Sequence, residues 1–257
     1  MITLTSAQLD AWVALFMWPF ARILGLVIAA PIGGNQRYPV TVQLGLAICV
    51  TVALVPLLPP LPQVAPDSLE GVAIFAQQLV VGLAMGFAMR LIFVAVEMAG
   101  ELIGMQMGLG FAQLYDPQNA AHMPVVSGFL TVIAGLLFLA INGHLLMFSA
   151  LAESFQQIPI GAAVLGPAGW STLVAWGTSV LQAALLLALP VIAALLAVNL
   201  ALGVLSRAAP QLNLFAVGFP VTLLIGFGAL LACLPWFTPI LERLVEGGTV
   251  AMLGVGR

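Results

Sequence analysis

Long apolar segments alternate with short breaks rich in proline and glycine along most of this sequence. A helix needs about 20 apolar residues to cross the hydrocarbon core of a membrane, and most of the segments are of that length or longer. The pattern therefore predicts an all-α, integral membrane-type protein made of long helices and helical hairpins. The predicted segments cover residues 11–30, 40–58, 69–107, 124–151, 170–205 and 217–234.

Two of these segments are too long for a simple membrane span. Residues 69–107 would form a helix longer than 50 Å at about 1.5 Å per residue. Residues 170–205 contain Pro190, and a proline inside a helix bends or breaks it. We therefore expect both segments to be bent or broken helices that pack on other helices. Residues 239–253, which carry both acidic and basic side chains, are expected to form a separate short amphipathic helix.

The composition supports a protein that sits in lipid or in an apolar assembly. Hydrophobic residues make up 63% of the chain and charged residues 6%, against about 25% charged in soluble domains. The chain has no lysine and six arginines, and no basic patch that would bind a nucleic acid. The positive-inside rule places the turns with Arg37 and Arg207 in the cytoplasm. Arg243 and Arg257 near the C-terminus argue against that orientation.

Few residues could carry catalysis or bind a metal. Cys49 and Cys233 lie in apolar segments and are expected to be buried thiols, not a disulfide or a metal pair. His122 and His144 have no cysteine or carboxylate at ligand spacing, which favours hydrogen-bonded histidines over a metal site. No recognised nucleophile, zinc-protease or nucleotide-binding motif is present. We therefore expect no enzyme activity, no metal and no cofactor. The first segment lacks a preceding basic region and is expected to stay in the mature protein.

Three charged residues lie inside the long segment 69–107. Arg90, Glu97 and Glu101 are seven and four residues apart, so one continuous helix would place them on a single face. Ionisable residues in an apolar segment are candidates for function. We expect a buried charge network that is completed by partner chains, and a proton relay is the alternative.

The segment that follows contains turn residues between two apolar helices. Gly100, Gly104 and Gly108 recur every four residues, a spacing that allows another backbone to approach closely. The turn residues Asp116-Pro117 then end the helical pattern. A loop at this depth must be buried in protein or line a cavity, because lipid would leave its backbone polar groups unsatisfied. It is either an ordinary interfacial loop or a re-entrant element that blocks a pore.

Residues 206–220, SRAAPQLNLFAVGFP, form a short polar break between two apolar segments, as expected for the tip of a helical hairpin. The run 207–220 resembles the hallmark segment of the FliR family of flagellar export-gate proteins, which is related to the SctT proteins of injectisomes. Residues 101–124, the run Asn142-Gly143-His144 and the stretch PIGGNQRYPVTVQLGLA also resemble that family. The resemblance covers essentially the whole chain.

The resemblance implies a role in protein export. FliR-like proteins join FliP and FliQ in an all-helical gate through which unfolded flagellar subunits leave the cell. It also implies a position in the bacterial inner membrane within the flagellar basal body, raised towards the periplasm. FlhB would wrap the cytoplasmic entrance and FlhA would lie nearby. Residues 1–165 would form a FliP-like part and residues 166–257 a FliQ-like hairpin with a C-terminal amphipathic segment.

The resemblance also assigns functional residues. The loop at about 108–123 corresponds to a plug that closes the pore, and the hairpin tip would contact a partner such as FlhB. An injectisome gate protein, a secondary transporter and a membrane-bound lipid enzyme that uses His122 or His144 are the alternatives. The plug or gate residues would be Met105, Met107, Gly108, Leu109, Gly110, Phe111, Tyr115, Asp116 and Pro117, and the tip residues would be Arg207, Pro210, Gln211 and Asn213.

Overall fold

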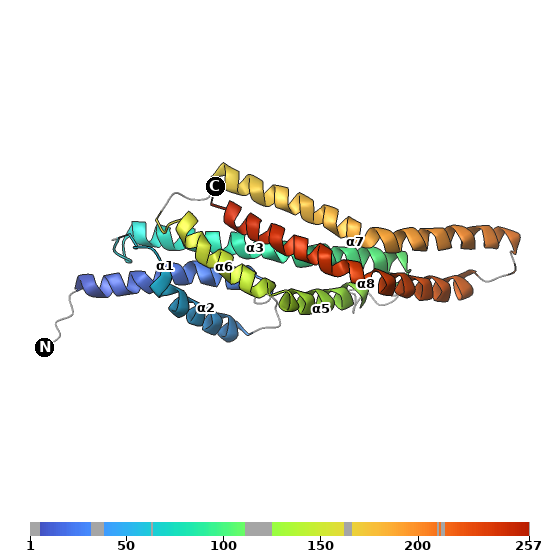
Figure 1. The fold of residues 1–257 in the computed structure, drawn as a ribbon, viewed down its shortest axis with the longest axis horizontal. Coiled ribbons are helices and arrows are strands. Elements are labelled where there is room, and N and C mark those ends of the chain that lie inside the picture. The colour runs from blue at the N-terminus through green and yellow to red at the C-terminus, as the bar shows by residue number, and fades with distance from the viewer. Residues whose placement is uncertain are drawn as a thin grey trace. The chain divides into compact units, whose positions relative to one another are not determined.

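Helices make up most of the part of the chain that the structure describes (Figure 1). The computed structural model describes residues 6–31, 39–62, 64–110, 125–161, 166–209, 211 and 214–256. No strand occurs among these residues, which confirms the all-α fold class. The helices are α1 (Ser6–Ala29), α2 (Val40–Leu54), a 3-10 turn η1 (Val55–Leu57), α3 (Leu69–Gln106), α5 (Val125–Ala140), α6 (Gly143–Gln157), α7 (Pro167–Ala208) and α8 (Leu214–Gly254).

Two predicted boundaries are wrong, and each has a local reason. The segment predicted at 124–151 is two helices, α5 and α6, because the chain turns at Asn142 with a left-handed φ of 57°. Asparagine tolerates this conformation better than most residues. The predicted C-terminal amphipathic helix is not separate. It is the end of α8, which continues through Pro235 and Pro239.

The long helices α3 and α7 extend without interruption over 38 and 42 residues. Pro190 lies inside α7 and has no N–H, so the carbonyl of Leu186 loses its usual helical donor. The sequence predicted that both segments are either bent or broken. Neither α3 nor α7 is broken.

Several helices are long and apolar enough to cross a membrane. There are five such helices among the described residues, and α5 with α6 would make a sixth span if the broken pair counts as one. The apolar windows of α1 and α3 are 50% and 56% buried, whereas those of α2, α7 and α8 are only 11%, 17% and 22% buried. The chain therefore leaves large apolar helix surfaces for lipid or for other helices to cover.

The described chain forms two compact units. Unit 1 contains residues 1–91, 142–178 and 245–257, and unit 2 contains residues 92–141 and 179–244. Each unit includes residues from both sides of position 165, so this division differs from the FliP-like and FliQ-like parts expected from the resemblance. Those parts concern likeness to FliP and FliQ and remain a prediction.

Glycines let α1 and α3 approach closely in unit 1. A Cβ atom added to Gly82 would overlap the carbonyl oxygen of Arg22, and one added to Gly86 would lie 2.6 Å from the carbonyl oxygen of Leu26. Gly25 on α1 makes the reciprocal contact, 2.5 Å from the carbonyl oxygen of Leu79. Gly82 and Gly86 are four residues apart, the small-residue spacing that brings helix backbones together in membranes.

In unit 2, α3 packs against α5 through a similar contact. A Cβ atom at Gly100 would overlap the Cα atom of Ser127, so this glycine allows the close backbone approach expected from the sequence. The hydroxyl of Ser127 donates a 3.0 Å hydrogen bond to the carbonyl oxygen of Glu97. Phe93 and Phe138 add an edge-to-face ring contact with centroids 5.6 Å apart.

Candidate functional site

The candidate gate begins where α3 ends in unit 2. Gly108 has a φ of 83°, which glycine adopts without strain. The N–H of Leu109 donates to the carbonyl of Gly104 at 3.1 Å, and the N–H of Gly108 donates to that of Met105 at 3.0 Å. These two bonds form a Schellman motif, which satisfies carbonyls that the helix end would otherwise leave unpaired. The helix therefore ends at a defined turn before residues 111–124.

Met107 ties this turn to α8. Its side chain is fully buried, and a Cβ atom on Gly226 would lie 2.7 Å from its Cγ atom. The hydroxyl of Thr222 donates a 3.3 Å hydrogen bond to the carbonyl oxygen of Met107. The sequence suggested that Met107 belongs to an apolar seal. The geometry places it at the base of the loop, packed against α8, and its part in a seal stays a prediction.

The other predicted gate residues divide into two groups. Met105 is 61% exposed, and Leu109 and Gly110 are partly exposed on the turn. Met105 and Gly108 also line a cavity of about 430 Å³ with residues of α7 and α8. Four predicted gate residues lie outside the described residues: Phe111, Tyr115, Asp116 and Pro117.

The predicted charge network is not buried by the chain's own packing. Arg90 and Glu101 are exposed and Glu97 is half-buried. Within this chain, Arg90 and Glu101 are therefore left uncovered. That partner chains cover these side chains stays a prediction.

Among the described residues, the charged side chain that the chain buries is Arg22, which no sequence pattern singled out. Its side chain is fully buried in unit 1, between α1, α3 and α6. Nε donates to Oε1 of Gln78 at 2.7 Å, Nη1 to Oγ of Ser154 at 3.1 Å and Nη2 to the carbonyl oxygen of Ile158 at 2.8 Å. The guanidinium carbon lies 4.2 Å from the ring centroid of Phe155, a cation–π contact.

Neutral groups surround Arg22 in all these contacts. The arginine joins three segments that are far apart in sequence, so it organises unit 1. The signal that could have found it is simple: an arginine in the interior of the first apolar segment must have polar partners.

The predicted hairpin tip connects α7 to α8. Arg207, in the last turn of α7, and Gln211 are exposed, whereas Pro210 and Asn213 lie outside the described residues. A cation in the last turn of a helix is favoured by the helix dipole. Exposed polar side chains at the tip are available for a partner.

The histidines and cysteines supply no catalytic or metal centre in the described part of the chain. His144 is half-buried near the start of α6, and its Nδ1 atom is buried without a hydrogen-bond partner. His122 lies outside the described residues. Groups of three or more metal-binding side chains are absent from the residues that were placed. Both cysteines are free thiols, but Cys49 is exposed and Cys233 half-buried, so the expectation that both are buried is wrong.

Comparison with known proteins gives matches along nearly the whole chain. Residues 13–248 match the family described as bacterial export proteins, family 1. The flagellar biosynthetic protein FliR of Escherichia coli strain K12 is 42% identical over 244 residues, which cover 95% of this chain and 93% of that protein. FliR of Pectobacterium carotovorum subsp. carotovorum is 43% identical over the same shares. FliR of Bacillus subtilis strain 168 is 31% identical over 222 residues, 85% of each chain.

Proposed function

We propose, from the fact that this chain belongs to family 1 of the bacterial export proteins, that it forms the flagellar type III export gate together with FliP and FliQ. The match over residues 13–248 carries this proposal, since all the relatives reported above are flagellar biosynthetic proteins. None of these relatives is named as an enzyme. The flagellar names favour a flagellar gate over an injectisome gate, and the family favours export over secondary transport.

The poorly covered apolar helices support a role in a larger assembly. A chain whose α2, α7 and α8 windows are at most 22% buried needs lipid or other helices around it. FliP and FliQ would supply helices of the same kind. The assembly would lie in the bacterial inner membrane within the flagellar basal body, raised towards the periplasm, with FlhB at its entrance and FlhA nearby.

Co-purification and complementation test this role. The tagged chain, expressed with its own FliP and FliQ and extracted in mild detergent, should be recovered with several copies of those partners. It should also restore swimming to cells that lack their own FliR. Recovery of the chain alone, with no restoration of swimming, would contradict the gate role and favour a transporter.

The loop after Gly108 is proposed as the plug. The defined turn and the buried Met107 give the loop a fixed base, which a plug requires. Flexible methionine, glycine and phenylalanine would form a seal that prefers no cargo sequence. An apolar constriction of this kind can exclude ions by dewetting.

Deletion of residues 110–114 tests the plug. If the complex still assembles, cells should leak ions and small solutes across the inner membrane. A length-preserving variant with serine at the same positions separates the chemistry of the seal from the length of the loop. A deletion complex that assembles fully and stays as tight as wild type would show that the loop is a peripheral one.

The hairpin tip is proposed to face the cytoplasmic entrance, near FlhB. In a Cys49→Ser, Cys233→Ser background, Arg207→Cys and Gln211→Cys should react with a membrane-impermeant maleimide only from the cytoplasmic side. Labelling from the periplasm alone would reverse the orientation.

The exposed carboxylate of Glu101 is proposed to meet a partner chain. Glu101→Ala should then reduce recovery of FliP and FliQ, since removal of one partner of a buried charge pair costs roughly 3–5 kcal/mol. Glu153→Ala is the matched control, because Glu153 is also an exposed helical carboxylate and hydrogen-bonds within its own helix to Gln157. Equal recovery from both variants would refute a partner contact at Glu101.

A further inference from the structure

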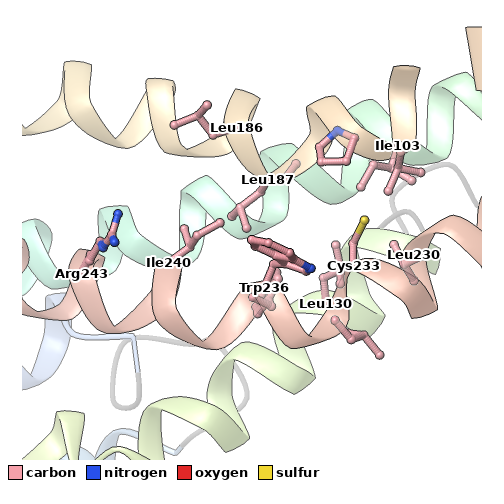
Figure 2. Close-up of a pocket in the computed structure, with 14 residues that line it drawn as sticks. Ile103, Leu130, Leu186, Leu187, Leu230, Cys233, Trp236, Ile240 and Arg243 are labelled. Atoms are coloured by element: carbon pink, nitrogen blue, oxygen red, sulfur yellow. The ribbon is translucent and has the colours of Figure 1, made fainter. Parts of the chain in front are cut away.

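A cavity of about 510 Å³ lies within unit 2, between α3, α5, α7 and α8 (Figure 2). This volume falls in the range of roughly 300–1,000 Å³ that is typical of small-molecule sites. Every residue of its wall belongs to a helix, so no free backbone N–H faces a ligand. The wall is almost entirely aliphatic and aromatic.

The cavity has a buried floor and an exposed rim. Ala99, Ile103 and Val191 on the floor are at most 2% exposed. Leu186 and Trp236 on the rim are 64% and 72% exposed. The cavity is therefore open to the surroundings of the helices, where an apolar molecule could enter from the side.

Arg243 is the one charged residue that lines this cavity. In Figure 2 it lies at one end, and the indole of Trp236 lies between it and Cys233 at the other end. Arg243 is exposed and makes no hydrogen bond or ion pair within the described part of the chain. A cation at the edge of an apolar helix bundle is most stable beside an anion.

We propose that this cavity binds an anionic phospholipid, with one acyl chain against the apolar wall and the phosphate on Arg243. A hydrocarbon chain brings no polar groups into the cavity and leaves none unsatisfied. An irregular peptide segment would bring backbone N–H and C=O groups that find no partners on this wall, which is costly. Basic pockets between membrane helices are typical sites for anionic headgroups, and tryptophan is common at the level of the headgroups.

Native mass spectrometry of the purified gate complex tests this proposal. The complex is delipidated and offered dioleoyl phosphatidylglycerol or dioleoyl phosphatidylcholine, which share the same acyl chains. We expect the anionic lipid to be retained about fivefold better, the effect of one arginine near a headgroup. Arg243→Gln should remove this preference, and Glu242→Gln, which removes a neighbouring exposed charge outside the cavity, should keep it.

A cavity-filling variant tests the acyl-chain site. Cys233→Phe adds a ring to the wall and should reduce retention of both lipids, while Ala232→Phe, at the exposed neighbouring position, should not. In a Cys49→Ser background, Cys233 is the single thiol. Its reaction with an apolar maleimide should slow when phosphatidylglycerol is present and should be unaffected by inorganic phosphate.

Three results would overturn the proposal. Equal retention of the two lipids in the wild-type complex would show that Arg243 does not select the headgroup. Retention unchanged by Cys233→Phe would place the lipid elsewhere. A complex that retains neither lipid, with Cys233 unreactive, would show that a partner helix fills the cavity. The gate role itself is tested separately by recovery of FliP and FliQ, so its failure can be told apart from failure of this site.

Discussion

The α1–α3 contact is packed tightly within the chain, whereas the outer helices α2, α7 and α8 leave most of their surface uncovered. The first is a closed core, in which glycines bring two backbones together and Arg22 has partners from three segments. The outer helices are similarly apolar, yet most of their residues are uncovered. Hydropathy alone therefore does not say which helices this chain packs by itself. Glycines that meet the backbone of another helix identify this core, whereas Gly226 on α8 meets only the side chain of Met107. Helix surfaces without close contacts are the ones that other molecules must cover.

The largest effect should come from Arg22. Arg22→Met keeps much of the apolar stem but leaves Gln78, Ser154 and the carbonyl of Ile158 without their donor. Each buried unsatisfied group costs about 1–3 kcal/mol, so we expect a loss of roughly 3 kcal/mol or more in the free energy of unfolding. Heating the detergent-solubilised protein and measuring the folded fraction by size-exclusion chromatography would show this.

Arg207→Met is the control for that measurement. Arg207 is exposed in the last turn of α7, and surface substitutions usually change stability by less than about 0.5 kcal/mol. Similar melting curves for Arg22→Met and wild type would mean that Arg22 does not hold unit 1 together.

Substitution of glycine by alanine should lower stability in the α1–α3 contact and raise it on the uncovered helix α8. At Gly82, alanine forces α1 and α3 apart, because its Cβ meets backbone instead of a flexible side chain. We expect a destabilisation of roughly 1–3 kcal/mol. At Gly228 on α8 nothing lies within 4 Å of the added Cβ, so alanine should stabilise the helix by up to about 1 kcal/mol. Destabilisation of the same size at both positions would erase the distinction between core and uncovered helix.

The sequence predicted the helical class and most helix positions because length and hydropathy decide them. It missed features that depend on single residues in three dimensions. The left-handed turn at Asn142 divides one apolar segment into two helices, and the polar run Asn142-Gly143-His144 that marks it is only three residues long. Residues 239–253 were expected to form a separate helix, yet α8 continues through Pro235 and Pro239.

In the candidate site, as in the fold, the sequence predicted local features but not contacts between distant residues. Gly108 was placed correctly at a turn, since a left-handed φ favours glycine. Arg22 was passed over, because its importance depends on Gln78 and Ser154, which are 56 and 132 residues away. Met107 was predicted to belong to an apolar seal, but its contact with α8 could not be predicted, because no local pattern reveals the register of α8 against α3.

A polar substitution on an uncovered helix should leave the isolated chain stable but weaken its association with partner chains. Val52 on α2 is 61% exposed, so Val52→Ser should leave the melting of the isolated chain almost unchanged. If partner helices bury this side chain, its loss should weaken association by about 1.5 kcal/mol, roughly a tenfold drop in recovered partners. Thr51→Val, at the buried neighbouring position, is the internal contrast, since it should affect the chain itself. Normal partner recovery with Val52→Ser would indicate that lipid covers α2.

The smallest effect should appear at the base of the loop. Thr222 is 8% exposed, and its hydroxyl lies 3.3 Å from the carbonyl oxygen of Met107 and 3.0 Å from that of Phe219. The single hydroxyl proton is shared between these two acceptors, so each bond is partial. Thr222→Val keeps the shape of the side chain and should reduce stability by about 1 kcal/mol. Because Met107 would lose one of its two attachments to α8, the inner membrane should also leak slightly more in cells that carry the variant.

Thr178→Val, at an exposed position where the hydroxyl bonds only within α7, should change neither stability nor leakage. Leakage that is equal for the two threonine variants would show that the α3–α8 attachment does not position the loop, and that the base of the loop is no more specialised than the uncovered surface of α7.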